Sequence, residues 1–374
     1  MKKVKIMHIA DYHIGYTYKF LKDLAEVRRL EVLKSLEDLS IFANDKGIDL
    51  VLIAGDFLEA SSISPAYLGQ IKEILAGFKA RIFIVAGNHD YISLSSAYLD
   101  EDWPENTHIF KSNKIEKVFI EELNTSIFGA SFTSSYQRRG FLNGNLDIDE
   151  KNINIGIFHG DALFSSDDLY NPISKDDITS SGLDYLALGH IHKKSGILRF
   201  GKTDFAYPGS AASLSFAENG PREAILIELD KEVRNYDFYQ IGIGQFLTED
   251  FDLTNYRSER EIAENLRKFL NEKYPSHEKN YYKIKLLGRI DEKFFIDLNL
   301  LKSFLSDLAY VQIHDASSLD LDLDLIKKEN SLRGRVIHNI IVEKEEAKKQ
   351  GQGDKLELLD RSLEICLKAF EGKI

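Results

Sequence analysis

The segment IFIVAGNHDYIS (residues 82–93) joins an apolar run to three adjacent polar side chains. Its first half is rich in β-branched and aromatic residues, which is typical of a buried strand. Directly after the run stand Asn88, His89 and Asp90, which are able to bind metal or move protons. Ligand sites of α/β sheets gather at the carboxyl ends of strands. The segment therefore predicts an α/β fold with a functional site at one sheet edge.

The first ninety residues alternate strand-like and helix-like stretches. VKIMHIA (4–10), DLVLIAG (49–55) and RIFIVAG (81–87) are strand-like. Residues 20–44 and 65–78 have helical periodicity. This order predicts a sheet of parallel strands covered by helices. We expect later strands to form a second sheet packed on the first, in an α/β sandwich. These candidates lie at 116–121, 125–131, 153–158, 184–189, 196–200, 223–229 and 235–240.

A change in composition after IGIGQF (241–246) marks the end of the first domain. We predict a sandwich domain over residues 1–243, a small α/β domain over 244–344, and a linker with a C-terminal helix over 345–374. The linker is predicted at 345–355, where polar residues and glycines gather. Further elements are expected at 258–273 (helix), 281–288 (strand), 292–307 (helix), 309–314 (strand) and 355–371 (helix).

Composition narrows the class of protein. The 374 residues suffice for two or three domains, and 43% hydrophobic content supplies a large core. Because no apolar run reaches the roughly 18 residues of a membrane span, we expect no membrane contact. The N-terminal stretch lacks the apolar core of a signal peptide, which predicts a cytoplasmic protein. The net charge of −12 excludes a chain that is basic throughout, yet allows a local basic groove.

The chain has one cysteine, Cys366, so an internal disulfide and a thiolate metal cluster are both excluded. A metal site must therefore use histidine, carboxylate or amide ligands. Asp11 and His13 are two residues apart and project to the same side of an extended chain, as do His190 and His192. The full set of candidate ligands is Asp11, His13, Asp56, Asn88, His159, His190 and His192.

This set is too large for one ion, which takes about four to six such ligands. It suits two ions that share a carboxylate, and Asp56, central in the order, is the natural bridge. Two-metal sites clamp both the attacking and the leaving oxygen in phosphoryl transfer. The mixture of His, Asp and Asn fits two Mn²⁺ ions, and Fe or Zn as well. The other histidines are interpreted as surface or core residues: His8, His108, His277, His314 and His338.

The ordered motifs D-x-H, G-D, G-N-H-D, H-G and G-H-x-H resemble the calcineurin-like metallophosphoesterase superfamily over residues 5–215, and YPGS (207–210) is a further similar feature. The resemblance implies a four-layer α/β/β/α sandwich. It implies a first metal bound by Asp11, His13, Asp56 and His192. It implies a second metal bound by Asp56, Asn88, His159 and His190.

The resemblance also implies two groups that bind no metal. His89 contacts the scissile phosphate or the leaving group, and Asp90 orients His89. The chemistry agrees, because an imidazole beside a bimetal centre is able to protonate a leaving oxygen. A neighbouring carboxylate favours the protonated ring.

Within the superfamily, HIADYHIG (8–15) is similar to the opening of DNA repair exonucleases of the SbcD type, including their YhaO-like branch. A weaker similarity continues through YYKIKLLGRID (281–291) to the end of the chain. The resemblance implies a metal-dependent DNA exonuclease, in which endonuclease activity is also expected, and a capping domain that binds DNA. One departure is Glu59, which stands where repair nucleases usually carry His or Asp after the G-D motif.

Basic residues near the motifs are candidate contacts for DNA phosphates. Arg138 and Arg139 lie in YQRRGF (136–141), and Lys193 and Lys194 follow the last metal histidine. Solvated surface charge is the alternative for both pairs.

The C-terminal helix carries a heptad-like seam of apolar residues. SbcD-type nucleases bind an SbcC/YhaN-like coiled-coil ATPase through C-terminal helices, so the seam is a candidate docking surface. Packing against the chain's own domain is the alternative, and a homodimer formed through helices of the phosphoesterase domain is a family expectation. The seam residues are Leu356, Leu359, Leu363, Cys366 and Phe370.

Two other functions compete with a nuclease. A phosphodiesterase or phosphatase for small molecules or phosphoproteins uses the same metals, but the extra domain at 244–344 disfavours it. A catalytically silent scaffold would keep the fold, but the complete ligand set and His89 argue against it.

Overall fold

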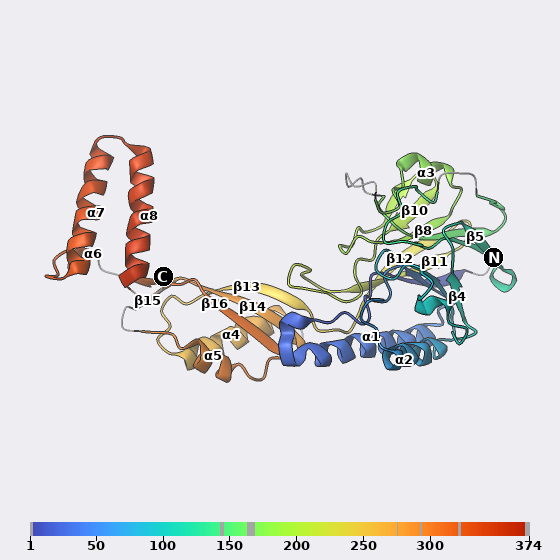
Figure 1. Ribbon diagram of the computed structural model, residues 1–374, viewed down its shortest axis with the longest axis horizontal. Coiled ribbons are helices and arrows are strands. Elements are labelled where there is room, and N and C mark those ends of the chain that lie inside the picture. The colour runs from blue at the N-terminus through green and yellow to red at the C-terminus, as the bar shows by residue number, and fades with distance from the viewer. Residues whose placement is uncertain are drawn as a thin grey trace. The chain divides into compact units, whose positions relative to one another are not determined.

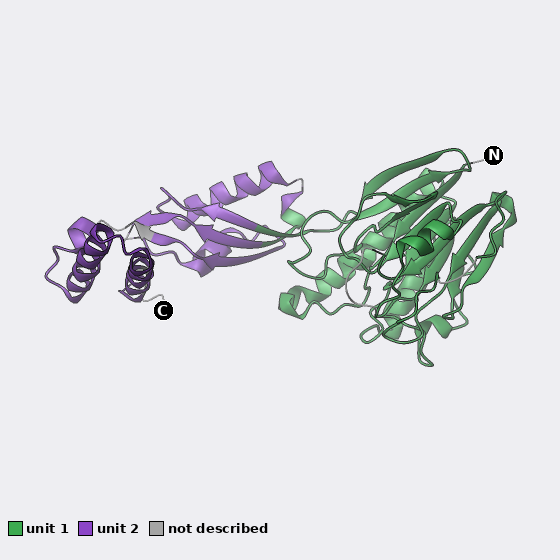
Figure 2. Cartoon of the chain, turned by 90° about the horizontal axis from the view of Figure 1, so that it is seen from above, with its two compact units in different colours: residues 1–248, 278–282 green, residues 249–277, 283–374 purple. Residues whose placement is uncertain are grey.

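The structure is a computed structural model that describes residues 3–142, 146–162, 169–274, 276–291, 294–320 and 323–370. The chain divides into two units, coloured separately in Figure 2. The first unit holds residues 1–248 and 278–282, and the second holds 249–277 and 283–374. The first unit thus ends close to the predicted boundary at residue 243. The predicted third part, 345–374, is not a separate unit but belongs to the second.

The predicted first sheet has six strands in the order β12-β11-β1-β2-β3-β4. β1, β2, β3 and β4 run parallel, as expected. The prediction that the two late strands join the second sheet is wrong, because β11 pairs antiparallel with β1 and β12 follows it. β11 thereby completes the hydrogen bonding of a β1 edge that would otherwise be open, and β12 covers β11 in turn. The strands are β1 (Val4–Ile9), β2 (Leu50–Ala54), β3 (Arg81–Val85), β4 (Thr107–Phe110), β11 (Glu223–Leu229) and β12 (Arg234–Gln240).

A second six-stranded sheet has the order β5-β6-β7-β8-β10-β9. β6, β7, β8 and β10 are parallel to one another. The sequence analysis omitted β4 and β10, which are only four residues long. The strands are β5 (Glu116–Ile120), β6 (Thr125–Gly129), β7 (Ile153–His159), β8 (Tyr185–Gly189), β9 (Leu198–Phe200) and β10 (Thr203–Ala206).

Apolar side chains of the two sheets meet in a shared core, which includes Ile6 and Leu52 from the first sheet and Ile155 and Ala187 from the second. Helices α1 (Ala25–Lys46) and α2 (Pro65–Ala76) lie along the outer face of the first sheet, and α3 (Lys175–Ser180) lies beyond the second (Figure 1). The α/β/β/α order confirms the predicted four-layer sandwich. Short 3-10 helices occur at Lys19–Leu24, Ala97–Leu99, Glu121–Leu123 and His277–Lys279.

The second unit is built on the three-stranded sheet β13-β14-β16. The predicted helix at 292–307 is shorter in the structure, and its residues 292–293 lie outside the described residues. The strands are β13 (Phe246–Asp252), β14 (Tyr281–Leu287), β15 (Arg289–Asp291), β16 (Tyr310–Asp315) and β17 (Ser318–Asp320). The helices are α4 (Glu259–Lys273), α5 (Leu298–Phe304), α6 (Leu323–Ile326), α7 (Leu332–Lys349) and α8 (Gly353–Phe370).

The predicted linker at 345–355 is wrong, because α7 continues to Lys349 and α8 begins at Gly353. Glu, Ala and Lys favour a helix, so the polar composition of this stretch misled the prediction. The chain turns at Gly351, whose φ of 67° suits glycine. α7 and α8 stand side by side as a helical hairpin (Figure 1). Among the described helices, none has the length and apolar character to cross a membrane.

The predicted seam on α8 mainly serves this hairpin. Leu363 is buried in a cluster with Ile337 and Ile326, which is the self-packing alternative. Phe370, at the end of the seam, is exposed. Leu356, Leu359 and Cys366 are half-buried.

His8 makes the stability of the sandwich depend on pH. Its ring is fully buried, and its Nδ1 lies 3.0 Å from the Tyr185 hydroxyl. Burial lowers the pKa of His8 to about 3. An unfolded chain would protonate this ring below about pH 6.5, whereas the folded chain would not until about pH 3. Stability is therefore lost as pH falls through that window.

We expect His8→Gln to remove this acid sensitivity. Urea unfolding at pH 6 and pH 5 should show the wild type losing about 1.2 kcal/mol more than the variant over that interval. His108→Gln, which removes a half-exposed histidine of the same unit, should keep the wild-type slope. Equal slopes for His8→Gln and wild type would contradict the assignment.

Candidate metal centre

The loops that follow β1 and β2 are bonded to each other along the backbone. Asp11 N–H donates to the Gly55 carbonyl at 3.0 Å, and His13 N–H donates to the Asp56 carbonyl at 2.9 Å. His190, which follows β8 of the other sheet, donates its N–H to both Asp11 carboxylate oxygens at 3.0 Å. The candidate ligands of the two sheets are thereby held at one place.

Backbone strain gathers at the same place. Asp11, His13, Asp56 and His190 have φ values of 51°, 47°, 46° and 105°. Left-handed backbone costs a non-glycine residue about 1–2 kcal/mol. The surrounding hydrogen bonds must hold these residues against that cost. Four such residues among seven predicted ligands indicate a functional site.

Two flanking glycines leave space for the ligands. A Cβ atom at Gly55 would lie 2.4 Å from His159 Nδ1, and a Cβ atom at Gly87 would lie 2.3 Å from Asp56 Oδ1. A side chain at either position would therefore displace a candidate ligand.

One group of ligand atoms comprises Asp11, His13 and His192, with all three atoms within 4.8 Å of one another. The Nε2 atoms of His13 and His192 lie 3.3 Å apart. Two ligands bound to one ion at about 2.1 Å are separated by roughly 3.0–3.4 Å in octahedral or tetrahedral geometry. The observed separation fits a shared metal ion.

A second group comprises Asp11, Asp56 and His159. His159 Nε2 lies 3.1 Å from Asn88 Oδ1 and 3.3 Å from Asp56 Oδ2. The same Asp56 oxygen lies 3.9 Å from His13 Nε2 in the first group, as a bridging carboxylate requires. The His190 ring stands 5.1 Å from the His159 ring. The structure thus brings together all seven predicted ligands, in two groups that share Asp11 and are also linked by Asp56, which lies near both His13 and His159.

The electrostatics of the site also suit cations. Burial opposes the charged form of His159, yet Asp56 and Asp11 raise its pKa to about 9. Two buried carboxylates therefore create a negative field that favours any cation beside them. Burial, followed by repulsion from His159, lowers the pKa of His190 to about 4, so that ring is neutral, as a ligand must be.

Residues outside the ligand set orient the imidazole rings of His192 and His159. His192 Nδ1 lies 2.7 Å from Glu218 Oε1, and His159 Nδ1 lies 3.0 Å from the Ala54 carbonyl. Each contact leaves Nε2 for a metal. The other oxygen of Glu218 accepts from Ser210 Oγ at 3.1 Å, in the YPGS segment. The sequence analysis missed Glu218, and its only signal is that it follows this segment by a few residues.

Within the part of the chain that the structure describes, His89 forms an ion pair with Glu59 and not with Asp90. Glu59 Oε2 lies 3.3 Å from His89 Nδ1 and 3.4 Å from His13 Nδ1. The hydrogen bond with Glu59 is the main reason that the pKa of His89 is raised. This differs from the predicted role of Asp90.

The carboxylate of Asp90 instead holds backbone of the neighbouring loops. It accepts from the N–H groups of Gly87, Phe57 and Leu58 at 2.7, 2.8 and 3.1 Å, and from the Tyr98 hydroxyl at 2.6 Å. Because Asp90 is buried beneath these donors, its structural effect is to fix the G-N-H-D loop.

The predicted DNA contacts differ in their surroundings. Lys194 lies 2.5 Å from Glu223 Oε2, so its charge is already paired. Lys193 is exposed beside it. Arg138 lies over the Tyr136 ring, 5.6 Å from its centroid, while Arg139 lines a separate cavity.

Comparisons with known proteins agree with this geometry. Residues 4–194 match the calcineurin-like phosphoesterase family. The uncharacterized metallophosphoesterase YhaO of Bacillus subtilis is 29% identical over 247 residues, which are 62% of this chain and 59% of that protein. The DNA double-strand break repair protein Mre11 of Methanopyrus kandleri is 23% identical over 289 residues, 71% of this chain and 63% of that protein. The chain spans less than two thirds of either relative.

Among solved structures, Vps29 of Entamoeba histolytica complexed with Zn²⁺ is similar with 15% identity and a TM-score of 0.28. The match covers 64% of this chain and 100% of that chain.

We expect Glu218→Ala to weaken metal binding by about ten- to a hundredfold, because the His192 ring loses the carboxylate that orients it. Competition between the protein and a Mn²⁺-sensitive dye measures the affinity. Glu223→Ala, which breaks an ion pair outside the site, serves as the matched control. An unchanged Mn²⁺ affinity in Glu218→Ala would show that His192 is oriented without Glu218.

Proposed function

Because the chain belongs to the calcineurin-like phosphoesterase family, we propose that it is a metal-dependent DNA nuclease, chiefly an exonuclease, that hydrolyses phosphodiester bonds. The observation that carries the proposal is the pair of ligand groups that share Asp11, with Asp56 near a histidine of each group and His89 beside them. We assign the first metal to Asp11, His13, Asp56 and His192, and the second to Asp56, Asn88, His159 and His190.

When bound, two divalent ions such as Mn²⁺ would activate water and neutralise the phosphoryl oxygens. Asp56 holds both ligand groups together. His89 directs Nδ1 to Glu59, which leaves Nε2 for the substrate, and its side chain is half-exposed. Since Glu59 raises the pKa of His89, it favours the protonated ring that a leaving oxygen needs. Glu59 is thus the positioning residue for His89, and Asp90 acts through the loop backbone.

A cavity of about 530 Å³ beside His89 supports a substrate larger than phosphate. Five serines line it together with the carboxylates of Asp90 and Asp100, and the described lining residues include no lysine or arginine. Hydroxyl groups suit the uncharged sugar and base of a nucleotide rather than another phosphate. We propose that the nucleoside next to the scissile bond enters this cavity. Its serines are Ser61, Ser64, Ser93, Ser95 and Ser96.

DNA is favoured over other phosphodiesters by the named repair protein among the relatives. We propose that Arg138, Lys193 and the second unit contact DNA phosphates, whose attraction to basic side chains depends on salt. Lys194 contributes less, because Glu223 already neutralises its charge.

We also propose two protein partners. A coiled-coil ATPase of the SbcC/YhaN type would dock on the face of α8 that points away from α7, where Leu358 and Ile365 are exposed one heptad apart. A homodimer would use Val27 and Leu30, exposed apolar residues of α1, and sedimentation velocity would report its doubled mass.

Each competing function predicts a different set of cleaved substrates. A small-molecule phosphodiesterase or a phosphatase would cleave bis-p-nitrophenyl phosphate or a phosphoprotein while leaving Mn²⁺-treated DNA intact. A silent scaffold would bind metal but cleave neither. An end-labelled DNA assay with Mn²⁺, run with and without the ATPase, separates the three.

We expect His89→Ala to retain its metal content and to lose at least about a hundredfold in DNA cleavage, because the leaving oxygen is no longer protonated. The loss should be smaller for bis-p-nitrophenyl phosphate, since p-nitrophenolate leaves without a proton. Elemental analysis measures the metal, and His108→Ala is the matched histidine control. Metal loss in His89→Ala would instead identify His89 as a ligand.

We expect Leu358→Asp combined with Ile365→Asp to abolish capture of the ATPase, because two charges would be buried at the interface. Hydrolysis of bis-p-nitrophenyl phosphate should be unaffected. Leu300→Asp introduces the same charge at an exposed apolar residue of α5 and should leave capture of the ATPase intact. Recovery of the ATPase by the double variant would place the docking surface elsewhere.

A further inference from the structure

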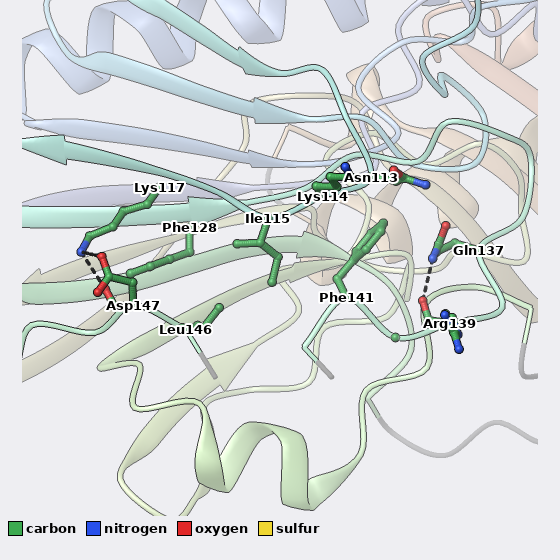
Figure 3. Close-up of a pocket in the computed structure, with 11 residues that line it drawn as sticks. Asn113, Lys114, Ile115, Lys117, Phe128, Gln137, Arg139, Phe141, Leu146 and Asp147 are labelled. Atoms are coloured by element: carbon green, nitrogen blue, oxygen red, sulfur yellow. Dashed lines mark hydrogen bonds and ion pairs between the residues drawn. The ribbon is translucent and has the colours of Figure 1, made fainter. Parts of the chain in front are cut away.

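A second cavity, of about 520 Å³, opens on the outer side of the second sheet (Figure 3). It lies between the start of β5, the β6 residue Phe128 and the loop that carries Arg139. Its volume is in the range of small-molecule sites. None of the proposed metal ligands lines it, so its contents are separate from the metal centre.

The floor of this outer cavity is apolar. Phe128 and Phe141 are buried in the aromatic core that covers the sheet, and Ile115 and Leu146 pack against that core. Figure 3 shows Ile115 and Phe141 between Arg139 at one end and Lys117 with Asp147 at the other. Ile115 and Leu146 are only half-buried, and a flat apolar group would remove their remaining surface from water.

The rim of the outer cavity is basic. Lys117 is paired with Asp147 at 2.9 Å. Lys114 and Arg139 are exposed, and within the described part of the chain no ion pair is recorded for either side chain. In a chain of net charge −12, these two side chains place positive charge above an apolar floor. Lysine and arginine in this setting suit a phosphate group.

Contacts made by the side chains of Asn171 and Phe132 connect this cavity to the metal centre. Asn171 Oδ1 accepts from Phe141 N–H at 2.7 Å, and Asn171 Nδ2 donates to the His159 carbonyl at 2.7 Å. The Phe132 ring lies 5.9 Å from Phe141 and 5.6 Å from His159. A ligand that presses on Phe141 therefore acts on the segment that carries a proposed metal ligand.

We propose that the outer cavity is a second nucleotide-binding site. Lys114 and Arg139 attract the phosphate to the rim, and the base lies on Ile115 and Leu146. Lys117 and Asp147 offer a donor and an acceptor to the polar edge of the base. The nucleotide is either free or part of a single strand, since both present the same phosphate and base. This inference does not depend on nuclease activity.

The test is equilibrium binding to the full chain, with Mn²⁺ and again in EDTA, so that binding at the metal centre is separated from binding at the outer cavity. The probes are dAMP, a fluorescent single-stranded oligodeoxyadenylate, and inorganic phosphate. We expect nucleotide binding to persist in EDTA and to be at least about tenfold tighter than phosphate binding, because phosphate lacks the base. Binding of dAMP would show that a free nucleotide is sufficient to occupy the outer cavity. Binding of the oligonucleotide alone identifies the strand as the ligand.

The decisive variant is Lys114→Gln combined with Arg139→Gln, which should weaken binding in EDTA by at least about tenfold. Lys111→Gln removes an exposed charge outside the cavity and should change nothing. Leu146→Asp, which charges the floor and keeps the rim, should also weaken binding. Three results would overturn the proposal: no binding of either nucleotide probe in EDTA, equal binding of phosphate and dAMP, or unchanged binding in the double variant.

Discussion

Two buried carboxylates, Asp11 and Asp56, impose the constraint on which the rest of the structure depends. An ionised carboxylate removed from water is costly unless cations or hydrogen bonds compensate it. Here the compensation comes from backbone donors, from the imidazole of His159 and, in our proposal, from divalent ions. The raised pKa of His159 is the direct sign of this negative field. Metal binding should accordingly release a proton from that ring.

This constraint explains why the site lies where the two sheets meet. Asp11 and Asp56 follow strands of the first sheet, whereas His159 ends β7 and His190 follows β8 of the second. The apolar core between the sheets therefore fixes the distances within the metal centre. Left-handed backbone at Asp11, His13 and Asp56 adds strain that the hydrophobic packing must offset. Stability and function are coupled through that packing.

Two glutamates, Glu59 and Glu218, contact histidines of the metal centre. Glu59, the departure from the usual repair-nuclease pattern, contacts both His13 and His89. It thereby links a proposed metal ligand to the proposed acid. Glu218 orients His192 from a loop that precedes β11. Asp90, by contrast, holds loop backbone, which shows that adjacency in sequence is a poor guide to a side chain's partner.

The sequence by itself determined the parallel strands and the candidate ligands at strand ends, because strand periodicity and i,i+2 spacing are local properties. The four layers were implied by the resemblance of its motifs to a known family. Only the tertiary structure decided that β11 and β12 join the first sheet, since both sheets offer an edge to an apolar strand. It alone placed Glu59 and Glu218 against their histidines and folded the expected linker into a helical hairpin. Those outcomes depend on contacts between residues distant in sequence, or on α7 and α8 packing together, which no local pattern encodes.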